Sequence, residues 1–164
     1  MATHDKHPNF VSKIAIIGAG VSGIAATKQL SHHNPIVFEA SDSIGGVWRH
    51  CSYNSTKLQS HRRDYEFSDF PWPQRNNSEF PTHLEILDYL YSYARHFDVL
   101  KNIRINSKVV EIRYVGDQEH ASNFGGQPND HGTPLPGYPV WELAVTNQSD
   151  TVQYSSSILM IKIR

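Results

Sequence analysis

A short apolar run followed at once by three spaced glycines, KIAIIGAGVSG at residues 13–23, constrains the fold of this chain more than any other feature. Lys13–Ile17 is short and rich in β-branched residues, which predicts a strand buried on both faces of a parallel sheet. Val21–His32 predicts a helix, which Asn34-Pro35 ends. Ile36–Phe38 predicts a second strand. Strand, helix and strand together form a βαβ unit, whose crossover is right-handed.

The glycines form a G-x-G-x-x-G motif at Gly18, Gly20 and Gly23. The first permits a tight turn, the second lets a pyrophosphate approach the backbone, and the third lets helix and strand pack closely. The helix N-terminus then directs its free N–H groups at the phosphates. The motif alone is weak evidence, because glycine-rich turns also serve structure. The context strengthens it, because Glu39 ends the second strand, about 20 residues after Gly18, where a ribose-binding acid is expected.

A carboxylate at Glu39 would accept the ribose hydroxyls and repel a 2′-phosphate. The alternative is a structural turn with a solvated Glu39. A second motif, EASDSIGGVWRH, follows directly and contains Gly45, Gly46 and Trp48. The glycine pair would let this segment close over a dinucleotide, with Trp48 against the cofactor. The alternative for Trp48 is a core aromatic.

The rest of the chain is expected to be mixed helix and strand. Residues 40–80 are loop-like, and residues 82–97 predict a helix with a capping box at Thr82 and Glu85. Its expected buried face holds Leu87, Leu90, Ala94 and Phe97. Strands are expected at 103–105, 108–115, 138–147 and 157–163, with Val110, Ile112 and Tyr114 on one side of the second and Trp141, Leu143 and Val145 together in the third.

The predicted organisation is a polar tail at 1–12 and one domain at 13–164, with a mobile loop at 116–137 inside it. The net charge of -1 gives no reason to expect nucleic acid as a partner. No apolar run approaches the ~20 residues of a membrane span. The single Cys51 cannot form an intramolecular disulfide and the N-terminus lacks a secretory signal, which together favour the cytoplasm.

Other chemistries find little support in the sequence. The ten histidines lack the spacing of a metal site, so no metal is expected. Cys51 has no matched base for nucleophilic catalysis, and no G-x-S-x-G elbow is present. FSDFPWP, residues 67–73, is interpreted as a structural turn whose aromatic residues serve packing rather than chemistry.

In this order and spacing, GAGVSG, FEASDSIGGVW and FSDFPWP resemble the N-terminal part of flavin-containing monooxygenases. The sequence STKLQS…YEFSDFPWP is most similar to the plant branch of this family. The resemblance implies an α/β, Rossmann-like FAD-binding domain with a parallel sheet and a β-rich C-terminal portion. It also implies an enzyme in which NADPH reduces bound FAD and an oxygen atom from dioxygen passes to a soft nitrogen or sulfur. The implied substrates are small amines, amino-acid-like molecules or thioethers.

Carried over residue by residue, the resemblance implies a pyrophosphate site at Gly18, Ala19, Gly20, Val21, Ser22 and Gly23. It places Glu39 on the adenosine ribose and Val47 and Trp48 further along the FAD. Gln59 stands where many relatives have an asparagine that contacts flavin and nicotinamide. Gln59 is therefore a candidate cofactor contact, with a loop residue bonded to backbone as the alternative. No catalytic side chain is assigned.

The family also has a second G-x-G-x-x-G for NADPH, which these 164 residues lack. We therefore expect a truncated FAD-binding part that is inactive alone, with the NADPH site elsewhere. Two alternatives stay open: a non-catalytic FAD-binding remnant, and a fragment of an amine-oxidase-like flavoprotein. The latter branch shares the glycine motifs but follows its glycine pair with arginine and lacks FSDFP.

Overall fold

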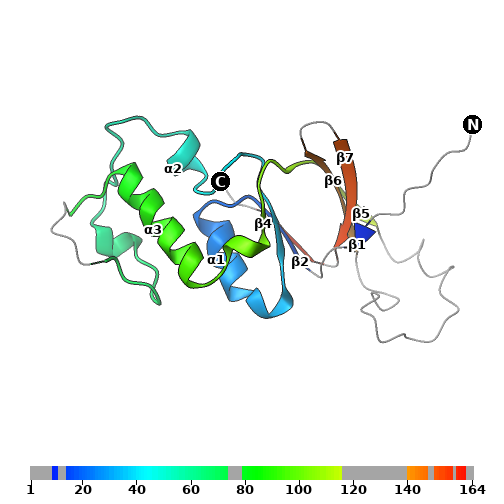
Figure 1. Cartoon of the computed structure of the whole chain (residues 1–164), viewed down its shortest axis with the longest axis horizontal. Coiled ribbons are helices and arrows are strands. Elements are labelled where there is room, and N and C mark those ends of the chain that lie inside the picture. Colours follow the sequence, from blue (N-terminus) through cyan, green and yellow to red (C-terminus); the bar gives the residue numbers. More distant parts are fainter. Residues whose placement is uncertain are drawn as a thin grey trace, which may run out of the picture.

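Helices, a parallel sheet and an antiparallel sheet lie in successive layers (Figure 1). The computed structural model describes residues 9–10, 14–73, 79–115, 140–147, 150–156 and 158–161. Its helices are α1 (Val21–Gln29), α2 (Val47–His50) and α3 (His83–His96), with 3₁₀ turns at Ser31–His33, Arg62–Tyr65 and Leu100–Asn102. Its strands are β1 (Asn9–Phe10), β2 (Ile14–Ile17), β3 (Ile36–Phe38), β4 (Ile103–Arg104), β5 (Lys108–Val115), β6 (Val140–Asn147), β7 (Asp150–Ser156) and β8 (Ile158–Ile161).

The parallel sheet has the strand order β4-β3-β2-β8, with every neighbouring pair parallel. The predicted pairing of the first two strands is confirmed, since Ala15 lies opposite Ile36 and Ile17 opposite Phe38. Alternate residues of β2 face different layers. Ile14 and Ile16 pack with the helices, whereas Ala15 packs with the antiparallel sheet. Both faces are buried, as the unbroken apolar run predicts.

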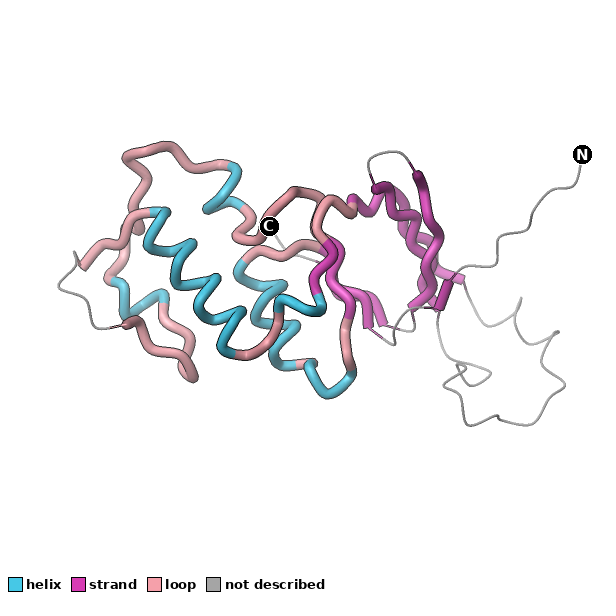
Figure 2. The backbone as a smooth tube through the Cα atoms, viewed as in Figure 1, coloured by secondary structure: helices cyan, strands magenta, loops and turns pink. Residues whose placement is uncertain are grey.

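The antiparallel sheet covers the face of the parallel sheet opposite the helices (Figure 2). Its order is β1-β7-β6-β5, and β1 joins it parallel to β7. Leu143 and Val145 of β6 are buried against Ala15, Ile36 and Phe38. The predicted α/β class, a Rossmann-like parallel sheet with a β-rich C-terminal portion, is therefore confirmed.

The first helix is shorter than predicted. The expected helix Val21–His32 is wrong at its C-terminal end, because α1 stops at Gln29 and residues 31–33 form a 3₁₀ turn. Asn34 then adopts a left-handed backbone conformation, with φ 46. Asparagine tolerates this conformation, and a residue before proline disfavours the α region. The local chemistry of Asn34 and Pro35 thus ends the helix through a tighter final turn.

The predicted loop at 40–80 also contains regular structure, namely α2 and the 3₁₀ turn Arg62–Tyr65. The capping box of α3 is confirmed, since Glu85 N–H donates to Thr82 Oγ1 and Thr82 N–H donates to the Glu85 carboxylate. Leu87, Leu90 and Ala94 are buried as expected. An amphipathic pattern and a cap together therefore locate this helix.

The strand Lys108–Val115 is confirmed, but Val110, Ile112 and Tyr114 are 52%, 38% and 53% exposed. β5 is an edge strand of the antiparallel sheet, and its register shifts between Val109 and Glu111. Tyr114 lies opposite Trp141, and their ring centroids are 5.1 Å apart. The pattern therefore identifies the strand but not a buried face.

Several predictions fall partly or wholly outside the described residues, among them Lys13 and the loop at 116–137. Within the predicted tail, Asn9–Phe10 forms β1. No helix in the described part of the chain is both long and apolar enough to span a membrane.

Candidate functional site

The glycine turn joins the end of β2 to the start of α1. Gly18 has φ 92, a conformation that glycine adopts without strain, and its N–H donates to Phe38 O over 2.8 Å. Gly23 has no room for a side chain, because a Cβ there would lie 1.9 Å from Gly18 O. The close approach of helix to strand at Gly23, predicted from the motif, is therefore confirmed.

The N-terminus of α1 carries no capping side chain. Gly20 is its N-cap residue and supplies no side-chain cap, and the first turn carries no acidic residue. The first-turn N–H groups and the positive end of the helix dipole therefore lack a carboxylate from their own helix. Val21 is half-buried and Ser22 is exposed. This arrangement suits a phosphate group.

Ala19 ties the glycine turn to the second motif. Its N–H donates to Glu39 Oε2 over 2.6 Å, and its carbonyl oxygen accepts from the N–H of Gly45 over 2.9 Å. The two peptide units on either side of Ala19 are thus each held by one residue of the second motif, the first by Glu39 and the second by Gly45. The two motifs, separate in the sequence, form one structural unit.

Glu39 lies at the end of β3 and is only 7% exposed. Its Oε1 accepts from the N–H of Ser41 over 2.9 Å and from the Ser41 hydroxyl over 2.6 Å. Its backbone N–H donates to Arg104 O, and its carbonyl oxygen accepts from Ser107 N–H. The alternative of a solvated Glu39 is therefore wrong, because the carboxylate is turned toward the glycine turn and bonded there.

Val47 and Trp48 begin α2, directly after the glycine pair. Val47 is 55% exposed, so its side chain is available to a ligand. Trp48 is half-buried, and its Nε1 donates to Tyr65 Oη over 2.6 Å. Burial raises the pKa of the Tyr65 hydroxyl, an effect that the Trp48 hydrogen bond partly offsets. The core role for Trp48 is thus the one that the contacts support.

Gln59 is exposed and lies in a different segment from the glycine turn. The hydrogen bonds of its neighbours run toward the start of α3. Leu58 N–H donates to Pro81 O, and His83 N–H donates to Thr56 O. The structure thus brings the predicted residues from Gly18 to Trp48 together. The Gln59 segment is instead held by backbone hydrogen bonds to residues around the start of α3.

The FSDFPWP segment packs against α3. The Tyr89 hydroxyl accepts from Phe67 N–H over 2.8 Å and donates to Phe70 O over 2.6 Å. Trp72 stacks on the Tyr89 ring, with centroids 4.1 Å apart. Burial raises the pKa of Tyr89 to about 12. The packing interpretation is supported, and Tyr89 is a key residue that the sequence did not single out.

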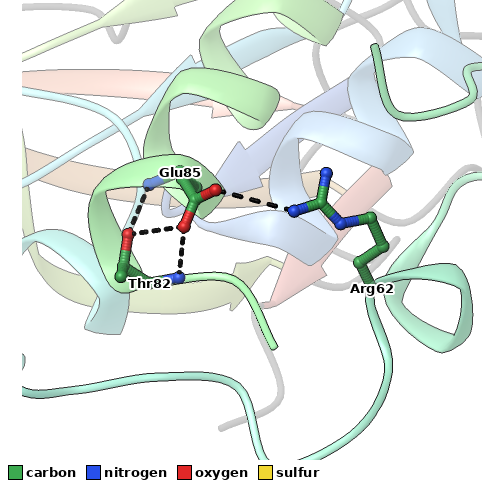
Figure 3. Close-up of polar contacts among 3 residues, drawn as sticks. All are labelled: Arg62, Thr82 and Glu85. Carbon is green, nitrogen blue, oxygen red and sulfur yellow. Dashed lines mark hydrogen bonds and ion pairs between the residues drawn. The ribbon is translucent and has the colours of Figure 1, made fainter. Parts of the chain in front are cut away.

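An ion pair between Arg62 and Glu85 lies next to the FSDFPWP segment. Figure 3 shows Glu85 between two partners: Thr82, with which it forms the capping box of α3, and Arg62. The Arg62 guanidinium lies 3.6 Å from the Glu85 carboxylate. Arg62 also lies over the Trp72 ring, 5.2 Å from its centroid. A shallow hollow opens here, and it shares no residue with the glycine turn. It is lined by Arg62, Trp72, Pro73, Glu85, Asp88, Tyr89 and Ser92.

In the part of the chain that the structure describes, no group of three histidine, cysteine or acidic side chains could hold a metal ion. Cys51 is an exposed free thiol. The chemistry of the site is therefore that of backbone N–H groups and one buried carboxylate.

Comparisons with known proteins agree with this geometry. The family described as FMO-like, flavin-binding monooxygenase-like, matches residues 11–128. The chain is 62% identical over 137 residues to the "probable flavin-containing monooxygenase 1" of Arabidopsis thaliana, and 56% identical over 143 residues to its "putative flavin-containing monooxygenase 2". These matches cover 82% and 87% of this chain but only 25% and 31% of the two relatives.

Solved structures share the fold. The S-allyl-L-cysteine S-oxygenase from Allium sativum matches 90% of this chain and 35% of its own, with a TM-score of 0.69 and 22% identity. A cyclohexanone monooxygenase from Rhodococcus sp. Phi1, bound to NADP⁺, matches 94% and 26%, with a TM-score of 0.73 and 22% identity. The resemblance to plant flavin-containing monooxygenases is thus confirmed, and the chain spans about a third or less of each of these proteins.

Proposed function

The chain belongs to the flavin-binding monooxygenase-like family, and we propose that it forms the FAD-binding part of an NADPH-dependent monooxygenase. One observation carries the proposal. A helix N-terminus without a side-chain cap lies beside a peptide unit that is held by the buried carboxylate of Glu39. The helix N-terminus would suit the diphosphate of an adenosine diphosphate group, and the carboxylate would suit its ribose.

The residues present fit the cofactor. The N–H groups at the start of α1 suit the diphosphate of FAD, since no acidic side chain of the first helical turn opposes it. Glu39 suits the adenosine ribose, because a carboxylate accepts hydrogen bonds from both hydroxyls. Val47, exposed at the start of α2, would contact the cofactor further along. For Trp48 and Gln59 a cofactor contact remains part of the proposal.

When bound, FAD supplies the redox chemistry by accepting a hydride from NADPH and delivering electrons to dioxygen. The residues of this chain bind and orient. The α1 N-terminus would fix the diphosphate, and Glu39 would fix the ribose. Because Glu39 is negative, it would also disfavour a 2′-phosphate. These residues would thus favour FAD over NADP⁺ at this site.

We propose that the whole protein oxygenates soft nitrogen or sulfur atoms of small amines, amino-acid-like molecules or thioethers. The glycine fingerprint at 18–23 accounts for one dinucleotide, so the NADPH site would lie outside these 164 residues. The chain alone is then expected to be inactive. We place it in the cytoplasm, where an exposed thiol such as Cys51 stays reduced.

Two other functions were open. A fragment of an amine-oxidase-like flavoprotein gains no support from the family match, which is to monooxygenases. A non-catalytic remnant would keep the same FAD site and differ only in lacking turnover. Activity, rather than binding, therefore distinguishes the remnant from the proposed function.

The test is a titration of the purified chain with FAD and with NADP⁺, followed by flavin and protein fluorescence. We expect FAD to bind more tightly than NADP⁺. Glu39→Ala should weaken FAD binding by about 1.5–3 kcal/mol, the scale of hydrogen bonds to a charged acceptor. Tighter binding of NADP⁺, or an unchanged FAD affinity in the variant, would contradict the proposal. An NADPH-consumption assay with an amine and a thioether should show no oxygenated product from the chain alone.

A further inference from the structure

The carboxylate of Glu39 is hydrogen-bonded by a neighbour to which the sequence motifs assign no role. Ser41 follows two residues later and bonds to Glu39 Oε1 twice, through its N–H at 2.9 Å and its hydroxyl at 2.6 Å. The second oxygen, Oε2, accepts from Ala19 N–H. The two oxygens are therefore held by different parts of the molecule, one by the glycine turn and one by Ser41.

The Ser41 hydroxyl has a choice of acceptors. It lies 2.6 Å from Glu39 Oε1 and 3.0 Å from the carbonyl oxygen of Ser43. One hydroxyl carries one proton, and the charged carboxylate is both the nearer and the stronger acceptor. The proton therefore goes to Glu39. The hydroxyl holds the plane of the carboxylate and not merely the loop.

The backbone of Ser41 does not depend on its hydroxyl. Its carbonyl oxygen accepts from Asn106 N–H over 2.8 Å, and its own N–H bonds to the carboxylate. Next to it, the carbonyl oxygen of Glu39 accepts from Ser107 N–H over 2.7 Å. Removing the hydroxyl should therefore leave the loop in place. The change would act on the carboxylate alone.

We propose that Ser41 is a positioning residue for FAD selection: its hydroxyl fixes the Glu39 carboxylate in the orientation that receives the adenosine ribose. The inference rests on the proposed function. A carboxylate fixed in advance loses less side-chain freedom when the ribose hydroxyls arrive, so the cofactor binds more tightly. Ser41 acts through Glu39 and need not touch the cofactor.

The experiment compares FAD affinities of the full chain and of five variants by fluorescence titration. Ser41→Ala should weaken FAD binding about threefold to tenfold, the scale of one ordered side chain. Ser41→Thr, which keeps the hydroxyl, should restore most of the affinity. Ser43→Ala is the matched control, because its hydroxyl bonds to exposed Asp42 instead and its loss should change affinity less than about twofold.

The last two variants, Glu39→Gln and the double variant Glu39→Gln/Ser41→Ala, test whether Ser41 acts through Glu39. In a Glu39→Gln background, Ser41→Ala should have a smaller effect than in the wild-type chain, because coupled residues are not additive. The thermal midpoint of Ser41→Ala should stay close to that of the wild type, which separates positioning from loss of folding. An unchanged or tighter FAD affinity in Ser41→Ala, or a full effect in the Glu39→Gln background, would overturn the inference alone. If the wild-type chain binds NADP⁺ more tightly than FAD, the proposed function fails together with it.

Discussion

The glycine turn and the FSDFPWP segment both carry sequence motifs, but different kinds of contact hold them in place. Around Ala19 the contacts are backbone N–H groups, a carbonyl oxygen and one carboxylate. Around Tyr89 they are aromatic rings and a hydroxyl that bonds to the protein on both sides. In the first region, the first turn of α1 has no side-chain cap and no acidic residue. In the second, the Tyr89 hydroxyl bonds to Phe67 N–H and Phe70 O. Trp72 Nε1, however, is buried there without a hydrogen-bond partner among the described residues. Under the proposed function, the first region would bind the cofactor, whereas the second supports the fold.

The largest effect should come from breaking the first region at Gly23. Gly23→Ala would place a Cβ 1.9 Å from Gly18 O, and backbone cannot yield as a side chain can. We expect a loss of about 3 kcal/mol in the free energy of unfolding, at the upper end of overpacking costs. Urea denaturation followed by far-UV circular dichroism measures it.

Gly20→Ala is the matched control for Gly23→Ala. Gly20 has φ -79, which alanine adopts readily, so the fold should persist while FAD affinity falls. If both variants unfold alike, or if neither changes FAD affinity, the prediction that the glycine turn binds FAD is contradicted.

A smaller effect is expected from the supporting region. Tyr89→Phe keeps the stack on Trp72 but leaves Phe67 N–H and Phe70 O without their hydroxyl partner. We expect about 1–3 kcal/mol of destabilisation, the cost of unsatisfied buried groups. FAD affinity, measured where the variant is fully folded, should not change. Tyr91→Phe, at an exposed tyrosine of the same helix, serves as the control. A loss of FAD affinity in Tyr89→Phe without a loss of stability would contradict the assignment of Tyr89 to support of the fold.

The smallest effect concerns the ion pair that joins α1 to the FSDFPWP segment. Lys28 Nζ lies 2.5 Å from Asp69 Oδ2, and this hydrogen bond is the main cause that lowers the pKa of Asp69 below 3.8. Because the folded-state pKa is depressed, the contribution to stability is present above pH 3.8 and is lost as the pH falls through the folded-state pKa. Asp69→Asn should therefore flatten the acid limb of stability slightly, as chemical denaturation between pH 5 and pH 2 would show. An equal acid limb in both proteins would mean that the pair contributes nothing.

The sequence predicted well those features that follow from local chemistry. The G-x-G-x-x-G motif predicted the turn and the close approach at Gly23, and Thr82 with Glu85 predicted the start of α3. It did not predict β7, because Asp150–Ser156 has only Val152 and Tyr154 as alternating apolar residues. It placed Val110, Ile112 and Tyr114 on one side of β5 without predicting their exposure, which follows from the position of the strand at the sheet edge.

Within the candidate site, the residue types were predictable but their partners were not. Glu39 was recognised by its distance from Gly18, yet its bonds to Ala19 and Ser41 depend on how the turn and loop meet in space. Tyr89 lies on an amphipathic helix, but the buried face predicted there held Leu87, Leu90, Ala94 and Phe97, whereas the structure buries Tyr89 as well. Nothing in that pattern says that its hydroxyl holds two backbone groups.

The bonds around Glu39 also set an order of events during synthesis. The loop that carries Glu39 and Ser41 is fastened by Arg104, Asn106 and Ser107, more than 60 residues later in the chain. A nascent polypeptide therefore cannot complete this site until β4 and the residues after it have left the ribosome. Because pairing across such separations closes large loops, it is slow compared with formation of α1. On a growing chain the glycine turn thus exists first as a local fragment, and the backbone around Glu39 and Ser41 is fastened only when the third strand of the parallel sheet arrives.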